Sequence, residues 1–195
     1  MQLEIYPVTD VEDLYLTNSF EINKGVTVLI GPNGAGKSTF LKSLKELYLD
    51  KNNITYFRFD NLLDGGANAK SKFGYYGKTD LLIESTFNSE GMNIVLNIGL
   101  KISEIGSYIR NIKNKNEEIW ILLDAIDSGL SIDNIVQINN VFELIIKDHP
   151  NTYIIVSANS YELVRNRHCL DVKSGNYIQF NDYEDYRNFI LKEIS

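Results

Sequence analysis

Residues 31–39 contain three glycines followed by Lys-Ser-Thr, in the order Gly-Pro-Asn-Gly-Ala-Gly-Lys-Ser-Thr. This order fits the spacing G-x-x-x-x-G-K-[ST] of a phosphate-binding loop. Glycines permit backbone conformations in which successive N–H groups point at phosphate oxygens. Lys37 is placed to reach the β- and γ-phosphates, and the Ser38 hydroxyl is placed to bind Mg²⁺. The segment predicts a site for a nucleoside triphosphate with Mg²⁺, formed by Asn33, Gly34, Ala35, Gly36, Lys37, Ser38 and Thr39.

The residues on either side of this segment predict the elements that position it. Residues 26–30 form a short β-branched run, which is typical of a buried strand in a parallel sheet. Residues 37–49 place apolar side chains at helical spacing. Such a helix would direct its positive N-terminal end at the same phosphates. Strand, glycine loop and helix therefore follow one another in the order that the motif requires.

A second apolar run, Ile119–Leu123, is followed by Asp124. A carboxylate at the carboxyl end of a parallel strand, beside a phosphate loop, can hold Mg²⁺ directly or through water. We therefore predict Asp124 and Ser38 as the metal-binding residues.

The remaining pattern predicts an α/β domain. We expect strands at 2–8, 19–22, 54–59, 152–156, 169–172 and 177–180, and helices at 92–113, 132–147 and from Asp182 to the C-terminus. Residues 19–22 and 26–30 suggest a hairpin, and residues 60–80 an extended loop. The fold class is a P-loop NTPase with a mainly parallel central sheet flanked by helices and an antiparallel N-terminal part. We expect one domain over 1–195, with 60–117 as its helical part.

Composition excludes several other classes. The chain has 195 residues, a formal net charge of −7 and one cysteine, which argues against a globally basic nucleic-acid binder and against a disulfide framework. Lys70, Lys72 and Lys78 are interpreted as surface lysines, and Cys169 as a packing residue. No apolar run approaches the ~18 residues of a membrane span, and Met1–Ile5 lacks the features of a secretory signal. We expect a cytoplasmic protein without membrane contact.

The glycine loop, together with Leu-Leu-Asp-x-x-Asp-Ser-Gly-Leu-Ser at 122–131, resembles the ABC-class ATPases. The likeness is greatest to the branch of SMC, Rad50 and RecF proteins and their small stand-alone relatives. The resemblance implies that Asp124 is the Walker B residue and that 128–131 form the D-loop, which crosses to a partner subunit. The segment between Lys37 and Asp124 is too short to contain a coiled-coil arm.

The same family carries a signature motif, typically Leu-Ser-Gly-Gly-Gln, before a helix. Asn88-Ser89-Glu90-Gly91-Met92 resembles it in position and in two residues. The resemblance implies that Ser89, Glu90 and Gly91 bind the γ-phosphate held by a second copy, in a head-to-tail homodimer that encloses two Mg·ATP. The alternative is that Ser89 is only a helix N-cap.

Two positions depart from the family pattern. Ala125 occupies the place of the usual catalytic Glu, and Asn159 occupies that of the usual switch His. The predicted catalytic residues are therefore Lys37, Asp124 and Asn159, without a Glu. Loss of a general base typically costs ~10²–10⁴ in rate. Asp127, or Glu90 from a partner, could replace it, and the sequence leaves open whether Ala125 is native or engineered.

Two further family features have no clear equivalent. Asp60 or Asn61 stands near the place of the usual Q-loop Gln. Tyr15 or Tyr6 could stack on the base, although among 12 tyrosines a structural role is the favoured interpretation for either.

These observations favour an ATP-binding switch with weak or no hydrolysis, acting in DNA repair, bacterial defence or phage biology. One alternative is a competent ATPase with a substitute base that acts on a nucleic-acid or protein partner, and another is an interaction module without turnover. A small nucleotide kinase is a third, although such enzymes clamp phosphates with several arginines. This chain has only Arg58, Arg110, Arg165, Arg167 and Arg187.

Overall fold

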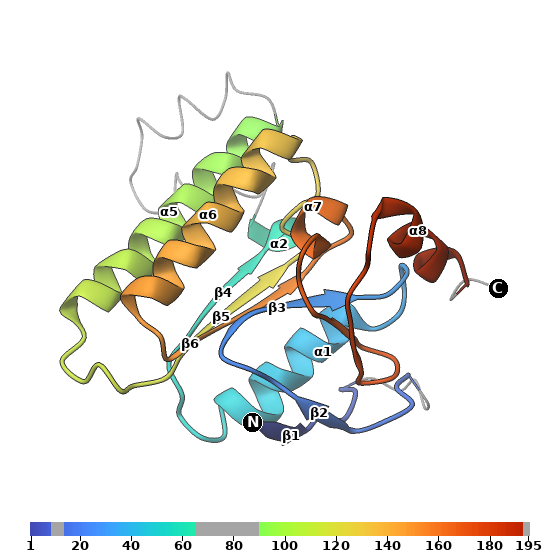
Figure 1. The fold of residues 1–195 in the computed structure, drawn as a ribbon. Coiled ribbons are helices and arrows are strands. Elements are labelled where there is room, and N and C mark those ends of the chain that lie inside the picture. The colour runs from blue at the N-terminus through green and yellow to red at the C-terminus, as the bar shows by residue number, and fades with distance from the viewer. Residues whose placement is uncertain (9–13, 65–89, 193–195) are drawn as a thin grey trace.

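The computed structural model describes residues 1–8, 14–64 and 90–192, without the side chains of Leu62 and residues 90–93. Its centre is a six-stranded sheet in the order β4-β5-β6-β3-β7-β8 (Figure 1). The strands are β3 (Gly25–Ile30), β4 (Tyr56–Asp60), β5 (Ile119–Asp124), β6 (Thr152–Ser157), β7 (Cys169–Asp171) and β8 (Tyr177–Ile178). All neighbouring pairs are parallel except β7 and β8. The predicted mainly parallel sheet is confirmed.

The strands β5 and β6 explain why the sheet needs helices on both faces. Every residue of both strands is buried, as expected where a parallel sheet is covered on each side. Along β5, Ile119, Ile121 and Leu123 belong to one apolar cluster, whereas Trp120 and Leu122 belong to another. This alternation follows from the two-residue period of a strand.

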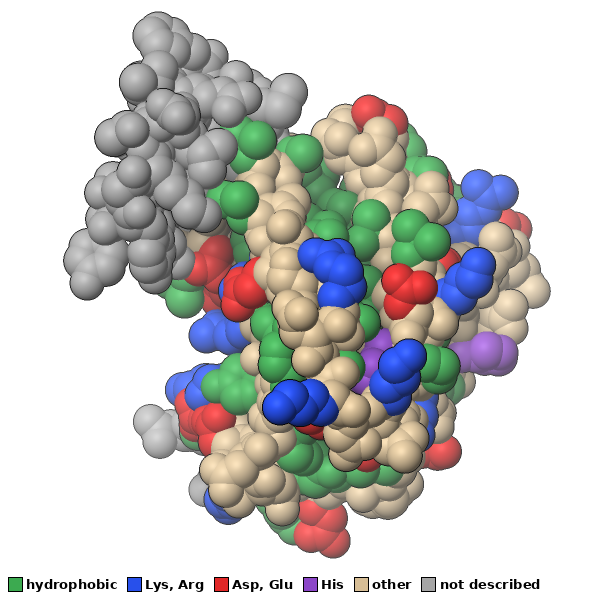
Figure 2. Space-filling model, turned by 90° about the vertical axis from the view of Figure 1, so that its left-hand side faces the viewer, with side chains coloured by type: hydrophobic (Ala, Val, Ile, Leu, Met, Phe, Trp, Pro, Cys, Tyr) green, Lys and Arg blue, Asp and Glu red, His purple; other side chains and the backbone are tan. Residues whose placement is uncertain are grey.

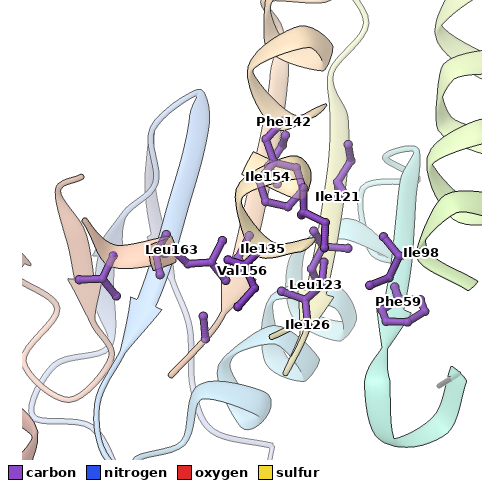
Figure 3. Packing of buried hydrophobic residues seen from close by; sticks show 14 of the residues in the cluster. Phe59, Ile98, Ile121, Leu123, Ile126, Ile135, Phe142, Ile154, Val156 and Leu163 are labelled. Carbon is purple, nitrogen blue, oxygen red and sulfur yellow. The ribbon is translucent and has the colours of Figure 1, made fainter. Parts of the chain in front are cut away.

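Two long helices, α5 (Glu90–Asn111) and α6 (Ile132–Asp148), cover one face of the sheet (Figure 1). Figure 3 shows how Ile98 of α5 and Ile135 and Phe142 of α6 meet the strands. The outer surface of this layer carries basic side chains dispersed among acidic, apolar and uncharged ones (Figure 2). Lys101, for example, pairs with Glu104 at 2.7 Å.

The other face is covered by α1 (Lys37–Leu44), which continues into a π-helical segment η1 (Lys45–Leu49). Phe40 and Leu44 of α1 pack in the second cluster with Trp120 and Tyr153, whose rings stack with centroids 4.2 Å apart. Because α1 begins directly after the glycine loop, burial of its apolar face also fixes the loop.

Three further helices complete the described chain: α2 (Asn61–Asp64), α7 (Tyr161–Val164) and α8 (Tyr183–Lys192). The Asp182 carboxylate accepts a hydrogen bond from the Asp185 N–H at 2.9 Å, so its predicted role as the cap of the last helix is confirmed. Residues 61–64 are helical, and the remainder of the predicted loop 60–80 lies outside the described residues. Within the described part of the chain, no helix has the length and apolar character needed to cross a membrane.

The predicted hairpin between residues 19–22 and 26–30 is wrong. Strand β2 (Ser19–Glu21) pairs antiparallel with β1 (Gln2–Glu4) in a separate two-stranded sheet, which forms the expected antiparallel N-terminal part. Strand β3 lies between β6 and β7 instead. Its residues Val28–Ile30 are fully buried, and a central position in the parallel sheet provides that burial. The predicted strand 2–8 ends at Glu4, before Pro7, which has no N–H to donate to a ladder.

Candidate functional site

A cavity of about 350 Å³ lies at the carboxyl ends of β3, β5 and β6. Open parallel sheets bind ligands at this edge. The lining combines three chain segments with one separate residue: Asn33–Thr39, Asp124–Ala125, Ser157–Asn159 and Leu14. The structure thus brings all predicted loop residues, Asp124 and Asn159 to one cavity.

The glycine loop has a conformation that requires glycine. Gly34 and Gly36 have φ values of 86° and 93°, a region that other L-residues rarely occupy. A Cβ on Gly36 would also lie 2.8 Å from Leu14 Cδ2. The loop leads directly into α1, whose N-terminal end therefore faces the cavity.

Lys37 is the buried cation of this site, with 9% of its surface exposed. Its Nζ donates hydrogen bonds to the carbonyl oxygens of Gly31 at 2.5 Å and Pro32 at 3.0 Å. Burial lowers the pKa of the Lys37 ammonium, and the carboxylates of Asp127 and Asp124 partly offset this change. An ammonium held inside the curve of a glycine loop can neutralise the charge of a polyphosphate.

Asp124 and Ser38 lie together, as predicted for a metal site. The Ser38 hydroxyl donates to Asp124 Oδ1 at 3.0 Å, and the Ser157 hydroxyl donates to the same oxygen. A carboxylate and a hydroxyl are hard oxygen donors of the kind that Mg²⁺ prefers, with further ligands from phosphates and water. No cluster of three or more His, Cys, Asp or Glu side chains occurs in the described residues. The donor set therefore fits a Mg²⁺ that is shared with a nucleotide.

Ala125 lies in the cavity lining with its backbone fixed from both sides. Its φ is 49°, in the left-handed region. The Ala125 N–H donates to Ser157 Oγ at 2.9 Å, and its carbonyl accepts from Asn61 Nδ2 at 3.1 Å. Asn61 Nδ2 also donates to the Ser128 carbonyl at 2.7 Å. The methyl group of Ala125 offers no proton acceptor at this point.

Asn61 and Asp60 were the two candidates for the Q-loop position, and they have different environments. Asn61 contacts the turn after Asp124, and its buried Oδ1 has no hydrogen-bond partner within the described part of the chain. Asp60 is aligned with Asp124 across the β4–β5 pair and binds Arg58 at 2.8 Å. Asn61 therefore contacts the main chain of Ala125, a residue of the cavity lining.

Asn159 lines the cavity at the end of β6, and Asp127 holds its main chain. Asp127 Oδ2 accepts hydrogen bonds from the N–H groups of Asn159 at 2.7 Å and Ser160 at 2.5 Å. The Asn159 carbonyl accepts from the Tyr186 hydroxyl at 3.0 Å. Asp127 thus links the turn after β5 to the loop after β6, while its suggested role as a substitute base stays a prediction.

Tyr15 cannot stack on a nucleobase, which excludes one of the two predicted candidates. Its side chain is 7% exposed, its hydroxyl donates to the Gly36 carbonyl at 3.0 Å, and its ring packs edge-on against Phe20. Tyr6 is 50% exposed and is absent from the cavity lining. Leu14, which the sequence motifs did not indicate, is the largest apolar residue of the cavity lining.

The predicted signature residues are only partly described. Ser89 lies outside the described residues, and Glu90 and Gly91 begin α5 without described side chains. Both the phosphate-binding and the N-cap interpretations of Ser89 therefore stay predictions. Ser157 is the polar contact that the motifs did not identify, and only its position after a predicted strand pointed to it.

Comparison with known proteins places the chain in a family. A family model described as ABC transporter matches residues 16–141. The match covers more than half of the chain, which therefore belongs to the ABC transporter family. Domains of this type bind ATP, generally with Mg²⁺. No curated protein sequence matches the chain.

Solved structures show the same fold. A nucleotide-free ATP-binding cassette from an ABC transporter matches with a TM-score of 0.57 and 16% identity, over 100% of this chain and 97% of that one. MJ1267, an ATP-binding cassette of an ABC transporter, matches with a TM-score of 0.50 and 17% identity, over 99% and 96%. Stu0660 of Streptococcus thermophilus matches with a TM-score of 0.52 and 12% identity, over 87% and 75%. The similarity to the SMC, Rad50 and RecF branch stays a prediction.

Proposed function

We propose that the protein is an ATP-dependent switch, in which two copies pair head to tail around two Mg·ATP and hydrolyse them slowly. The observation that carries this proposal is the meeting of Lys37, Ser38 and Asp124 at one cavity. Lys37 and the loop amides would bind the β- and γ-phosphates, while Ser38 and Asp124 would hold Mg²⁺. The ion would neutralise phosphate charge when bound.

Slow turnover is supported by Ala125, which lines the cavity where the family usually has a Glu. Without a carboxylate there, water that attacks the γ-phosphate lacks the usual proton acceptor. Binding is independent of that acceptor, because the loop, Lys37 and Asp124 form the phosphate and metal contacts. A bound nucleotide would therefore persist, as a switch requires.

Pairing of two copies is supported by the surface beside the predicted D-loop. Ile132 directly follows residues 128–131 and is 66% exposed, and Val136 lies one helical turn further along α6 and is 42% exposed. The apolar side chains at the start of this helix would be covered when the D-loop crosses to a second copy.

Sedimentation with and without Mg·ATP tests the proposal. We expect a monomer without nucleotide and a dimer with saturating Mg·ATP for the wild type. Lys37→Ala should abolish the dimer, whereas Lys42→Ala, on the same helix but exposed, should leave it unchanged. A wild-type monomer in saturating Mg·ATP would refute the switch.

Two alternatives make different predictions. A competent ATPase with a substitute base, acting on a nucleic-acid or protein partner, would release phosphate at a rate that the partner increases. A nucleotide kinase would transfer the γ-phosphate to a second nucleotide. Against the kinase, no arginine in the described residues lines the cavity, and Arg58, Arg167 and Arg187 pair with carboxylates elsewhere.

The pathway is also part of the proposal. Small stand-alone relatives of the SMC, Rad50 and RecF proteins, which the sequence resembles, act in DNA repair, bacterial defence or phage biology. The dimer state of a switch would be the signal that such a pathway reads.

A further inference from the structure

Ser157 is a buried polar residue that the phosphate-loop and Walker B motifs do not include. It is the last residue of β6 and is 3% exposed. Buried hydroxyls are costly unless they are hydrogen-bonded. Ser157 is bonded twice, and both bonds lead to β5 and the turn after it.

The direction of these two bonds is determined by their chemistry. The Ala125 N–H is a donor, so the Ser157 oxygen must accept from it, at 2.9 Å. The Ser157 hydroxyl has one proton, and Asp124 Oδ1 is the acceptor that receives it. The main chain of residue 125 therefore orients the hydroxyl, and the hydroxyl orients the carboxylate.

Ser38 also donates to Asp124 Oδ1, but Ser38 and Ser157 belong to different elements. Ser38 lies on the phosphate loop and is itself the predicted metal ligand. Ser157 lies on a strand whose neighbours β5 and β3 are both paired with it. Its contact with Asp124 is therefore independent of whether the Ser38 oxygen turns to a metal.

We propose that Ser157 is a positioning residue: its hydroxyl holds the Asp124 carboxylate in the orientation that binds Mg²⁺. This inference rests on the proposed function, because it requires that Asp124 and Ser38 bind the metal of Mg·ATP. Groups that orient metal-binding residues typically change metal affinity 10–100-fold when they are removed.

The test measures binding of a fluorescent ATP analogue, first in EDTA and then during a Mg²⁺ titration. For Ser157→Ala, we expect the Mg²⁺ concentration at half-effect to rise about 10–100-fold, with unchanged analogue affinity in EDTA. Ser157→Thr keeps the hydroxyl and should behave like the wild type.

A second comparison separates the hydroxyl from packing. Ser157→Thr and Ser157→Val have nearly the same shape, and only Thr can donate to Asp124. They remain informative if Ser157→Ala fails to fold, and thermal unfolding of each variant measures the effect on stability. We expect Val, and not Thr, to shift the Mg²⁺ titration.

Three results would overturn the inference: equal Mg²⁺ titrations for Thr and Val, equal titrations for Ala and the wild type, or an equal loss of analogue binding in EDTA. If Mg²⁺ did not change analogue binding by the wild type, the inference would also be overturned, although nucleotide binding itself would still be supported. No binding by the wild type under either condition would instead refute the proposed function.

Discussion

Replacement of Ala125 by Glu should accelerate the ATP hydrolysis that we propose to be slow. Ala125 lines the cavity, so a Glu at this position would place a carboxylate beside the space proposed for the phosphates. Loss of a general base lowers the rate by a factor of ~10²–10⁴. Restoring the base should raise the hydrolysis rate by a factor of that order. At ~1.36 kcal/mol per tenfold change, the gain corresponds to about 3–5 kcal/mol of transition-state stabilisation.

The backbone should accept this change. Residue 125 has a φ of 49°, and alanine already bears the cost of the left-handed region, which is about 1–2 kcal/mol for a residue with a Cβ. Glutamate would bear a similar cost. The hydrogen bonds of the 125 N–H and carbonyl, to Ser157 and Asn61, involve the main chain only. We therefore expect little change in the unfolding temperature.

The assay is single-turnover release of phosphate from Mg·ATP. Ala125→Gln is the matched control, since its amide has a similar size but cannot act as a base at neutral pH. The Ala125→Glu variant should release phosphate faster than both the Ala125→Gln variant and the wild type. If all three proteins released phosphate at the same rate while binding ATP equally, the assignment of residue 125 to the missing base would be refuted.

The remaining predictions concern the loop, the core and pH. Gly36→Ala should abolish ATP binding in a titration and lower stability by about 1–3 kcal/mol, because its φ is 93° and its Cβ would lie 2.8 Å from Leu14 Cδ2; unaltered binding would contradict the loop geometry. Trp120→Ala should cost about 3–5 kcal/mol in urea unfolding followed by circular dichroism, because Trp120 is fully buried against Tyr153. Burial raises the pKa of the Cys169 thiol from 9.0 to about 12. The folded state therefore favours the neutral thiol, and this stabilisation should be complete below pH ~9 and decline as the pH rises toward 12. Cys169→Ala should flatten the decline, and equal pH slopes for both proteins would contradict this reasoning.

The parts of the site that follow from short sequence segments could be predicted. The glycine loop is such a segment, because residue types at 31–39 determine both the backbone conformation and the donors. Asp124 was also predictable, since an apolar run followed by a carboxylate indicates the end of a buried strand. The alternation of Ile121 and Trp120 between two clusters follows from the strand period.

The contacts between strands could not be predicted, because they depend on the strand order. Ser157 meets Asp124 only because β6 lies beside β5, and Asn61 meets Ala125 only because β4 lies on the other side of β5. The hairpin assigned to residues 19–30 failed for the same reason. Two adjacent strands with a short turn suggest local pairing, but β3, whose residues Val28–Ile30 are fully buried, lies between two parallel neighbours instead.

Calorimetric titration of Mg·ATP into the purified protein is the decisive test of nucleotide binding at this loop. We expect saturable binding by the wild type and by the Lys42→Ala variant, whose altered residue is exposed, and loss of binding in Lys37→Ala. Correctly folded wild-type protein that produced no binding heat at any nucleotide concentration, at two temperatures, would contradict this expectation.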